Sequence, residues 1–262
     1  MPEQLTSWLS ISLYITACLQ QCLYINGKIQ CPKKTVILLS ILAICLHGAI
    51  LYHAIWQPPI MNLSLHNIFS LIACLITAFI LIACISLPLE NLLLLILPFA
   101  ALSLLFLCFL PQSHILTPAL NQVSLSHMSI SLSAISLLGM ASLQAMLLAL
   151  QNYLLRNKQL SSIVRYLPPL QTMETLLFQI IIVGFILLSA SLITGFCLHD
   201  HARHLAYLQK AGLSVLAWVF FASLLLGHCR LGWRGPTAVR LTLIGMIILS
   251  LAYLGSRLVN VI

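Results

Sequence analysis

Charged residues are scarce in this chain, and acidic ones are scarcest. Of the 262 residues, 12 are Lys or Arg and only four are Asp or Glu, so 6% of the chain is charged. Soluble domains contain roughly one quarter charged residues. Together with a mean hydropathy of +1.08, this composition excludes a soluble globular protein and predicts an integral membrane protein.

Paired cysteines and the usual catalytic motifs are missing as well. The nine cysteines are scattered and contain no CxxC pair, so neither a disulfide framework nor a thiolate metal site is indicated. We interpret those within apolar runs as small hydrophobic residues. The sequence also has no nucleophile and base pair, phosphate loop or paired carboxylates, so we expect no enzyme of the hydrolase or transferase classes.

Long apolar runs make up nearly the whole chain. A spanning helix needs about 20 such residues, because lipid offers no partner for unpaired backbone groups. We therefore predict an all-α, polytopic transmembrane helix bundle with about eight spanning helices, and residues 1–262 as a single membrane domain. The first run follows Glu3 and no basic residue, so we expect a retained helix. The eight predicted spans are 5–25, 35–55, 65–86, 92–110, 123–151, 176–197, 211–229 and 240–259.

Most basic residues fall in alternate loops between these runs. By the positive-inside rule, such loops face the cytoplasm and both termini lie outside. The net charge of +8 therefore reports topology, and we expect membrane lipid and no nucleic acid as a partner. A basic and apolar stretch at 152–170 predicts a helix at the cytoplasmic interface. The nine residues that set this orientation are Lys28, Lys33, Lys34, Arg156, Lys158, Arg165, Arg230, Arg234 and Arg240.

Nine histidines stand out against this apolar background. His47, His127 and His228 lie within or at the ends of predicted spans. An imidazole inside a membrane needs a reason, and a bound metal or haem is one. The alternative for His47 is a hydrogen bond to a neighbouring helix. For His127 it is a position at the aqueous boundary, and for His228 it is a favourable cation at a helix C-terminus. The residues alone leave both interpretations open.

Three further histidines form a cluster in the loop after the sixth span. The run at 199–204 contains His199, His201 and His204 beside Asp200. Three imidazoles and a carboxylate within six residues are suited to zinc or copper, or to an axial haem ligand. An ordinary solvated loop explains the same run.

Several segments share a family likeness. They include GFILLSASLITGF at 184–196, GHCRLGWRG at 227–235, MNLSLHNIFSLI at 61–72 and the helix that begins HMSISLSAISLL at 127–138. From about residue 40 onward, the chain resembles the cytochrome c assembly superfamily, which includes the CcsA/ResC and CcmC/CcmF haem-handling proteins. Within it, the chain looks like the small HemX/YpjD-type inner-membrane branch.

The resemblance implies a haem b ligated within the membrane by His47 and His228, which stand at the matching motifs. It also implies an outer haem ligand at His127, whose usual partner after the last helix has no counterpart up to Ile262. The tryptophan-rich segment of haem-delivery synthases is missing, because 198–210 contains no tryptophan. In the predicted spans, His47 lies roughly 18 Å from the cytoplasmic edge and His228 lies near it, so a shared iron requires tilt or shifted boundaries.

We therefore expect a multi-pass protein of the bacterial inner (plasma) membrane that binds or handles haem in cytochrome c biogenesis. The expected partners are haem and cytochrome c maturation proteins, and full synthase activity is in doubt. Two other functions remain open. One is a transporter or transport accessory for a metal ion that is captured at His199, His201 and His204. The other is a regulatory membrane protein of haem synthesis.

Overall fold

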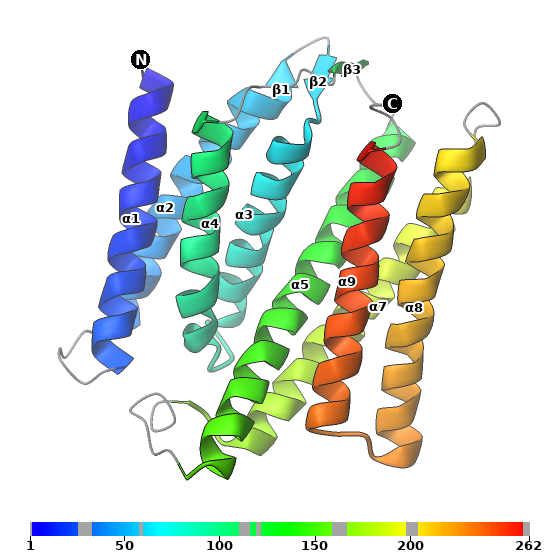
Figure 1. Ribbon diagram of the computed structural model, residues 1–262. Helices are drawn as coiled ribbons and strands as arrows, with labels where there is room; N and C mark the ends of the chain where they lie inside the picture. Colours follow the sequence, from blue (N-terminus) through cyan, green and yellow to red (C-terminus); the bar gives the residue numbers. More distant parts are fainter. Residues whose placement is uncertain are drawn as a thin grey trace. The chain divides into compact units, whose positions relative to one another are not determined.

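The computed structural model describes residues 2–25, 33–57, 60–109, 116–118, 122–158, 167–197 and 204–258. Long helices dominate this part of the chain (Figure 1). A short 3-10 turn, η1 (Glu90–Leu92), leads into the fourth of them. The helices are α1 (Pro2–Ile25), α2 (Lys33–Ile55), α3 (Leu65–Ala83), α4 (Leu93–Phe109), α5 (Gln122–Arg156), α7 (Leu170–Cys197), α8 (His204–Leu231) and α9 (Pro236–Leu258).

Eight helices in the described part of the chain are long and apolar enough to cross a membrane. The predicted all-α bundle of eight spans is therefore confirmed. The differences lie at helix ends: α5 continues to Arg156 instead of 151, and α7 begins at Leu170 instead of 176. Apolar runs mark only the part of a helix that lies in hydrocarbon, while the helix itself continues into the headgroup layer. Of the predicted interfacial helix, 152–156 continue α5, and 159–166 lie outside the described residues.

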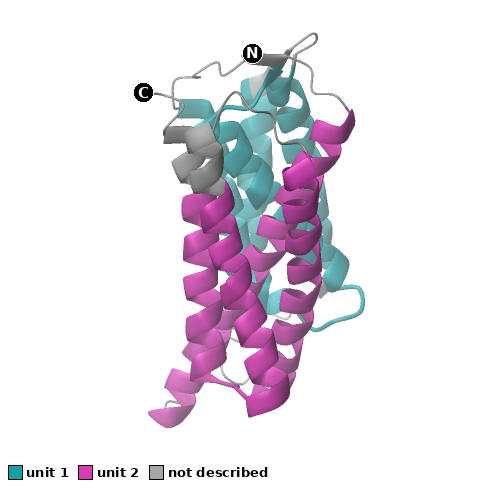
Figure 2. Ribbon diagram, turned by 90° about the vertical axis from the view of Figure 1, so that its right-hand side faces the viewer, with its two compact units in different colours: residues 1–119, 158–168 teal, residues 120–157, 169–262 magenta. Residues whose placement is uncertain are grey.

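The chain divides into two compact units (Figure 2). Unit 1 comprises residues 1–119 and 158–168, and unit 2 comprises 120–157 and 169–262. In unit 1, α1 packs against α2, α2 against α3, α3 against α4, and α4 against α1. In unit 2, α5, α7, α8 and α9 pack in the same cyclic order. Each unit is thus a ring of four helices, and the expectation of a single domain over 1–262 stays a prediction.

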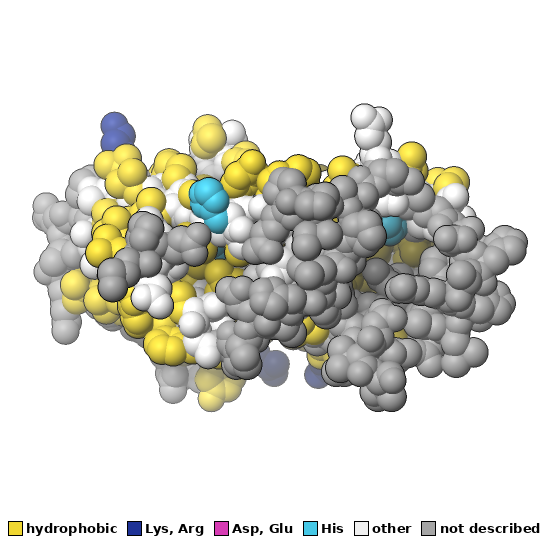
Figure 3. Space-filling model, turned by 90° about the horizontal axis from the view of Figure 1, so that it is seen from above, with side chains coloured by type: hydrophobic (Ala, Val, Ile, Leu, Met, Phe, Trp, Pro, Cys, Tyr) yellow, Lys and Arg dark blue, Asp and Glu magenta, His cyan; other side chains and the backbone are white. Residues whose placement is uncertain are grey.

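A small antiparallel sheet of three strands lies at one end of unit 1. It consists of β1 (Trp56–Gln57), β2 (Ile60–Asn62) and β3 (Leu116–Pro118), in which Trp56 pairs with Met61 and Asn62 with Leu116. Viewed onto this end, many of the described side chains are hydrophobic, with histidine among them (Figure 3). The sheet pairs the backbone N–H and C=O groups of segments that lie outside the helices. Without the sheet, these groups would need other hydrogen-bond partners.

Proline accounts for one contact between α1 and α4. Pro98 lies inside α4 and has no N–H for the carbonyl of Leu94, four residues earlier. The Cys18 thiol of α1 instead reaches that carbonyl, with Sγ 3.9 Å from the oxygen. A weak S–H donor on a neighbouring helix therefore helps to satisfy a carbonyl within the membrane.

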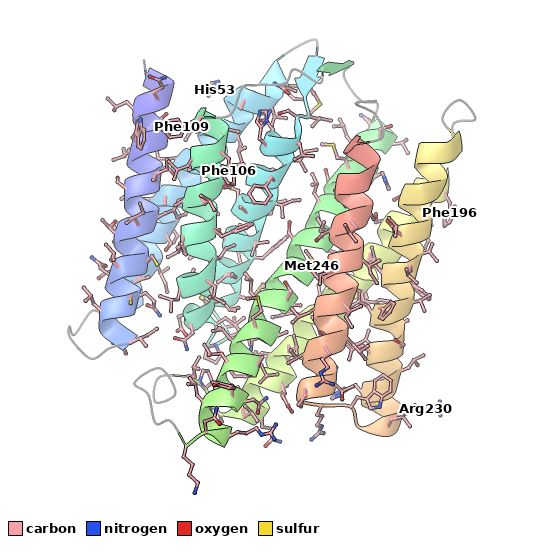
Figure 4. The ribbon with its side chains drawn as sticks, viewed as in Figure 1. His53, Phe106, Phe109, Phe196, Arg230 and Met246 are labelled. Atoms are coloured by element: carbon pink, nitrogen blue, oxygen red, sulfur yellow. The ribbon has the colours of Figure 1, made fainter. Side chains whose placement is uncertain are left out.

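Large apolar side chains project from the outer faces of the helices in both units (Figure 4). Phe109 of α4 is 70% exposed and Phe196 of α7 is 59% exposed. Exposure of this kind is unfavourable in water but expected where lipid surrounds the helices. The side-chain pattern agrees with a multi-pass membrane protein. Which side of the membrane each end faces stays a prediction.

Candidate functional site

His47 lies at the centre of unit 1. Its side chain is fully buried, as are those of Tyr14, Ser70 and Ser103. The Tyr14 hydroxyl lies 3.1 Å from Nδ1 of His47, and Ser70 Oγ lies 2.8 Å from Nε2. Ser70 Oγ in turn lies 3.4 Å from Ser103 Oγ. These four residues come from α1, α2, α3 and α4, so each helix of the ring contributes one member to the chain of hydrogen bonds.

The donor and acceptor of each hydrogen bond in this series follow from the number of protons that each group carries. Ser103 donates its single O–H to the carbonyl of Ala100, 2.8 Å away, so Ser70 must donate to Ser103. Ser70 therefore accepts the Nε2–H of His47, and Nδ1 of His47 accepts the hydroxyl proton of Tyr14. Every polar group is thus satisfied inside the membrane, where an unpaired one is costly.

This arrangement limits what His47 can bind. An iron ligand must present a free nitrogen lone pair. In His47, the lone pair on Nδ1 accepts a hydrogen bond from Tyr14, and Nε2 carries a proton that it donates to Ser70 in a hydrogen bond. The face of α2 that carries His47 is also covered. Ala43 is fully buried, and its carbonyl accepts a hydrogen bond from Ser10 of α1 at 2.9 Å. As arranged here, His47 does not fit a haem ligand unless one of its hydrogen bonds is exchanged.

His228 has a different environment, near the end of α8 in unit 2. Its ring is half-buried and stacks on Phe178 of α7, with centroids 3.6 Å apart and an interplanar angle of 18°. Nδ1 lies 2.9 Å from the carbonyl oxygen of Trp233. Since a carbonyl only accepts, Nδ1 carries the proton, and the lone pair of the neutral ring is on Nε2. This is the tautomer in which a metal-ligating histidine is usually held, by a backbone carbonyl on its other nitrogen.

The segment 227–235 builds this environment through a tight turn after α8. The backbone N–H of Trp233 donates to the carbonyl of Gly227 at 3.1 Å, which folds the indole back onto α8. A Cβ on Gly227 would overlap the Trp233 ring, so this close approach requires glycine. Gly232 takes φ +67°, a left-handed conformation that also favours glycine. The sequence block that carried the family likeness is therefore the block that positions His228.

Glu174 ties this turn to α7. Its Oε1 accepts the backbone N–H of Gly235 at 2.8 Å, and the carbonyl of Gly235 accepts the N–H of Val239 at the start of α9. A carboxylate next to a helix N-terminus is electrostatically favourable. Glu174 thus serves the start of α9 rather than that of its own helix. Glu174 and Phe178 lie four residues apart on α7, so one face of this helix holds both the turn and the His228 ring.

His127 lies in the first turns of α5, at the other end of unit 2. Its Nδ1 lies 3.0 Å from Thr194 Oγ1 of α7. Thr194 donates its hydroxyl proton to the carbonyl of Ala190 at 2.9 Å, so it accepts from Nδ1–H of His127. His127 therefore has the same tautomer as His228, with the lone pair on Nε2.

The two histidines of unit 2 belong to different sites. Their partners on α7, Phe178 and Thr194, are 16 positions apart, which is about 24 Å along a helix. One iron cannot bind both histidines. The expectation of one ligand inside the membrane and another at its outer edge stays a prediction. The predicted pair of His47 and His228 joins residues of different units, so it stays a prediction.

The expected metal cluster at 199–204 is not described. His199 and His201 lie outside the described residues, as does the side chain of His204 at the start of α8. Within the part of the chain that was searched, no group of three or more His, Cys, Asp or Glu residues could hold a metal ion. The metal site at this loop therefore also stays a prediction.

Several partners of these histidines were not expected from the sequence. Tyr14, Ser70 and Ser103 surround His47, and Phe178 stacks on His228. Each looks ordinary in its own helix, because serine and aromatic residues are common in membrane spans. The sequence gives only a weak indication of these residues. Tyr14 places a hydroxyl group in an apolar run, and Ser70 and Ser103 lie well inside other apolar runs.

Comparisons with known proteins agree with this architecture. Residues 35–262 match the family described as Cytochrome C assembly protein, and this match includes His47, His127 and His228. The chain is 32% identical over 199 residues to the inner membrane protein YpjD of Escherichia coli strain K12, covering 76% of this chain and 75% of that protein. It is also 33% identical over 136 residues to an Azospirillum brasilense protein described as an uncharacterized 28.8 kDa protein in the nifR3-like 5' region, covering 51% and 50%.

No solved structure matches the chain significantly. The family match covers unit 2 and the part of unit 1 from residue 35 onward, and the eight spanning helices agree with the inner-membrane location in the name of the Escherichia coli relative. The chain is therefore a multi-pass inner-membrane protein that belongs to the cytochrome c assembly protein family.

Proposed function

We propose that this protein binds haem b in its membrane region and handles it for cytochrome c biogenesis, with His228 as an axial ligand. Family membership supports the biogenesis role. The observation that supports the ligand is the hydrogen bond of 2.9 Å from Nδ1 of His228 to the carbonyl of Trp233. It sets the tautomer with a lone pair on Nε2 and fixes the plane of the ring.

The neighbours of His228 have separate tasks in this proposal. Phe178, only 4% exposed, stacks on the ring and restricts its rotation. The Trp233 carbonyl accepts a hydrogen bond from Nδ1–H and so keeps the lone pair of the ring on Nε2, the ligand nitrogen. Arg234 follows in the same turn and provides a cation for a propionate. A bound haem supplies an iron centre, either as cargo for assembly or as a redox cofactor.

The other two histidines enter the proposal differently. His127 is an outer haem ligand, and Thr194 orients its ring as Trp233 does for His228. Ligation by His47 requires either its Nδ1 to exchange the Tyr14 hydroxyl for the iron, or its proton to move from Nε2 to Nδ1 so that Nε2 can exchange Ser70 for the iron. Because 198–210 contains no tryptophan, we assign haem binding or handling to the chain and not full synthase activity.

Visible spectroscopy of the purified full chain tests this proposal. The protein is isolated in mild detergent and its spectrum is recorded with and without added haem. We expect a Soret band and, after extraction, the pyridine adduct of haem b. The band should decrease in His228→Ala, by the share that an outer haem at His127 does not contribute, and should be unchanged in His53→Ala. His53 is an exposed histidine of α2 and serves as the matched control.

Each result has a clear meaning. Absence of a band under both conditions overturns haem binding. A band that is unchanged in His228→Ala overturns the ligand assignment. A band that is kept but shifted in His127→Ala, with His228 intact, supports a second haem at the outer site.

A further inference from the structure

A pocket of about 550 Å³ lies between the end of α5 and the start of α9 in unit 2. This volume is in the range of small-ligand sites in proteins. The lining combines apolar and polar side chains from both helices. Its residues are Ala149, Asn152, Tyr153, Arg156, Asn157, Pro236, Val239 and Arg240.

The pocket carries two positive charges, and neither of them forms an ion pair within the described residues. Arg156 comes from α5 and Arg240 from α9, and both are exposed. The whole chain contains only four acidic residues, so few carboxylates are available to pair with these arginines. Glu174 is the one described acid of unit 2, and its carboxylate accepts the N–H of Gly235 beside the start of α9. Asp200 lies outside the described residues. Two guanidinium groups that converge from different helices favour a phosphate or carboxylate.

The depth of the pocket indicates where such an anion comes from. The 35 residues of α5 extend about 52 Å, well beyond a hydrocarbon core of about 30 Å even at a tilt near 20°. Its last turns therefore reach the headgroup layer. Tyr153 is 62% exposed there, as is typical of an interfacial aromatic residue. Nitrogen-tipped side chains gather at this end of unit 2, near the labelled Arg230 (Figure 4).

We infer that this pocket binds the phosphate headgroup of an anionic phospholipid. Arg156 and Arg240 bind the phosphate, and Asn152 and Asn157 offer amide groups to the headgroup. Val239 is buried and, with Ala149, provides an apolar wall for the glycerol and the first acyl carbons. Pro236, the first residue of α9, also lines the pocket. Basic pockets between spanning helices on the cytoplasmic side favour such lipids.

Lipid binding to the full chain tests this inference directly. The protein is delipidated in a nonionic detergent and titrated with dioctanoyl phosphatidylglycerol, with dioctanoyl phosphatidylcholine in parallel, and binding is followed by native mass spectrometry. We expect tighter binding of phosphatidylglycerol. We also expect Arg156→Gln and Arg240→Gln each to weaken it about fivefold. Arg230→Gln removes the same charge at the same end without lining the pocket, and should change the affinity less than twofold.

Three results would overturn the inference. Equal weakening by Arg230→Gln would show a general charge effect. Competition by inorganic phosphate at the same concentration as the lipid would show a site for free anions. Displacement of one lipid by each haem that binds would show that the two arginines bind haem propionates instead of the lipid phosphate. Melting temperatures of the variants, measured without lipid, separate a binding defect from a folding defect.

Discussion

The two units place their polar groups differently. Unit 1 has a fully buried chain of hydrogen bonds at its centre, with one residue from each of its four helices. Unit 2 joins neighbouring helices in pairs, such as Ser131 with Ser191 at 2.6 Å, and has its two candidate ligands, His127 and His228, about 24 Å apart along α7. In unit 1 both ring nitrogens of the histidine form hydrogen bonds to other helices, whereas in unit 2 the hydrogen bond of Nδ1 sets the tautomer of each candidate ligand.

The two units also differ in the length of their helices. Helices α1 to α4 have 17–24 residues, or about 26–36 Å, which matches a bilayer core of about 30 Å. Helices α5, α7 and α8 have 28–35 residues, or about 42–52 Å. Unit 1 is thus matched to hydrocarbon. The longer helices of unit 2 extend into the headgroup layers, where His127 and the turn after His228 lie.

His47→Leu should have the largest effect on unit 1. It leaves the Tyr14 hydroxyl and the Ser70 hydroxyl without their buried partner, and each such loss costs about 1–3 kcal/mol. We expect the free energy of unfolding in detergent to fall by about 2–4 kcal/mol. His53→Leu, at an exposed position on the same helix, should change it by less than about 0.5 kcal/mol. Loss of a haem band without loss of stability would instead make His47 a ligand.

Gly227→Ala should disrupt the turn of unit 2. The new methyl group overlaps the Trp233 ring and displaces the carbonyl that holds His228, at a cost of about 1–3 kcal/mol. We expect lower stability and less bound haem, measured on the same sample. Gly212→Ala provides the control on the same helix, because a Cβ added at Gly212 has no neighbouring atom within 4 Å. Equal haem binding by both variants would contradict a positioning role for the turn.

Glu174→Gln should weaken the tie between α7 and α9. The amide oxygen still accepts from Gly235 N–H, but the negative charge near the start of α9 is lost. A favourable charge at a helix end contributes about 0.5–1 kcal/mol, and we expect a loss of that size in thermal unfolding. A larger loss in Glu174→Ala would follow from removing the acceptor as well. Stability equal to the wild type in both variants would exclude this role.

Ser103→Ala should have the smallest effect. Ser103 is the last member of the unit 1 chain and accepts from Ser70 over a long distance of 3.4 Å. Hydrogen bonds between membrane helices contribute about 0.6 kcal/mol on average, and we expect a loss near that value. Ser12→Ala is the control, because its exposed hydroxyl donates only within α1, to Leu9. If both changes cost the same, Ser103 does not belong to an interhelical chain.

Sequence patterns predicted the spans well but not the contacts. Apolar runs located all eight helices, because the need for backbone pairing in lipid leaves few alternatives. They did not predict the three-stranded sheet, whose strands of two or three residues are too short to show a period. The sequence identifies the candidate histidines, because an imidazole within an apolar run is energetically unfavourable unless it has a partner. Their partners, such as Tyr14 and Phe178, depend on helix packing and could not be read from one helix alone.

The central question is whether His228 binds haem iron. The most direct measurement is the Soret absorbance per mole of protein for wild type, His228→Ala and His53→Ala, purified in parallel and saturated with haem. We predict equal absorbance for wild type and His53→Ala, and a lower absorbance in His228→Ala by the amount of haem that this residue holds, with the melting temperatures of the haem-free proteins measured to exclude a folding defect. Retention of the wild-type band in His228→Ala would contradict the assignment of this residue as the ligand.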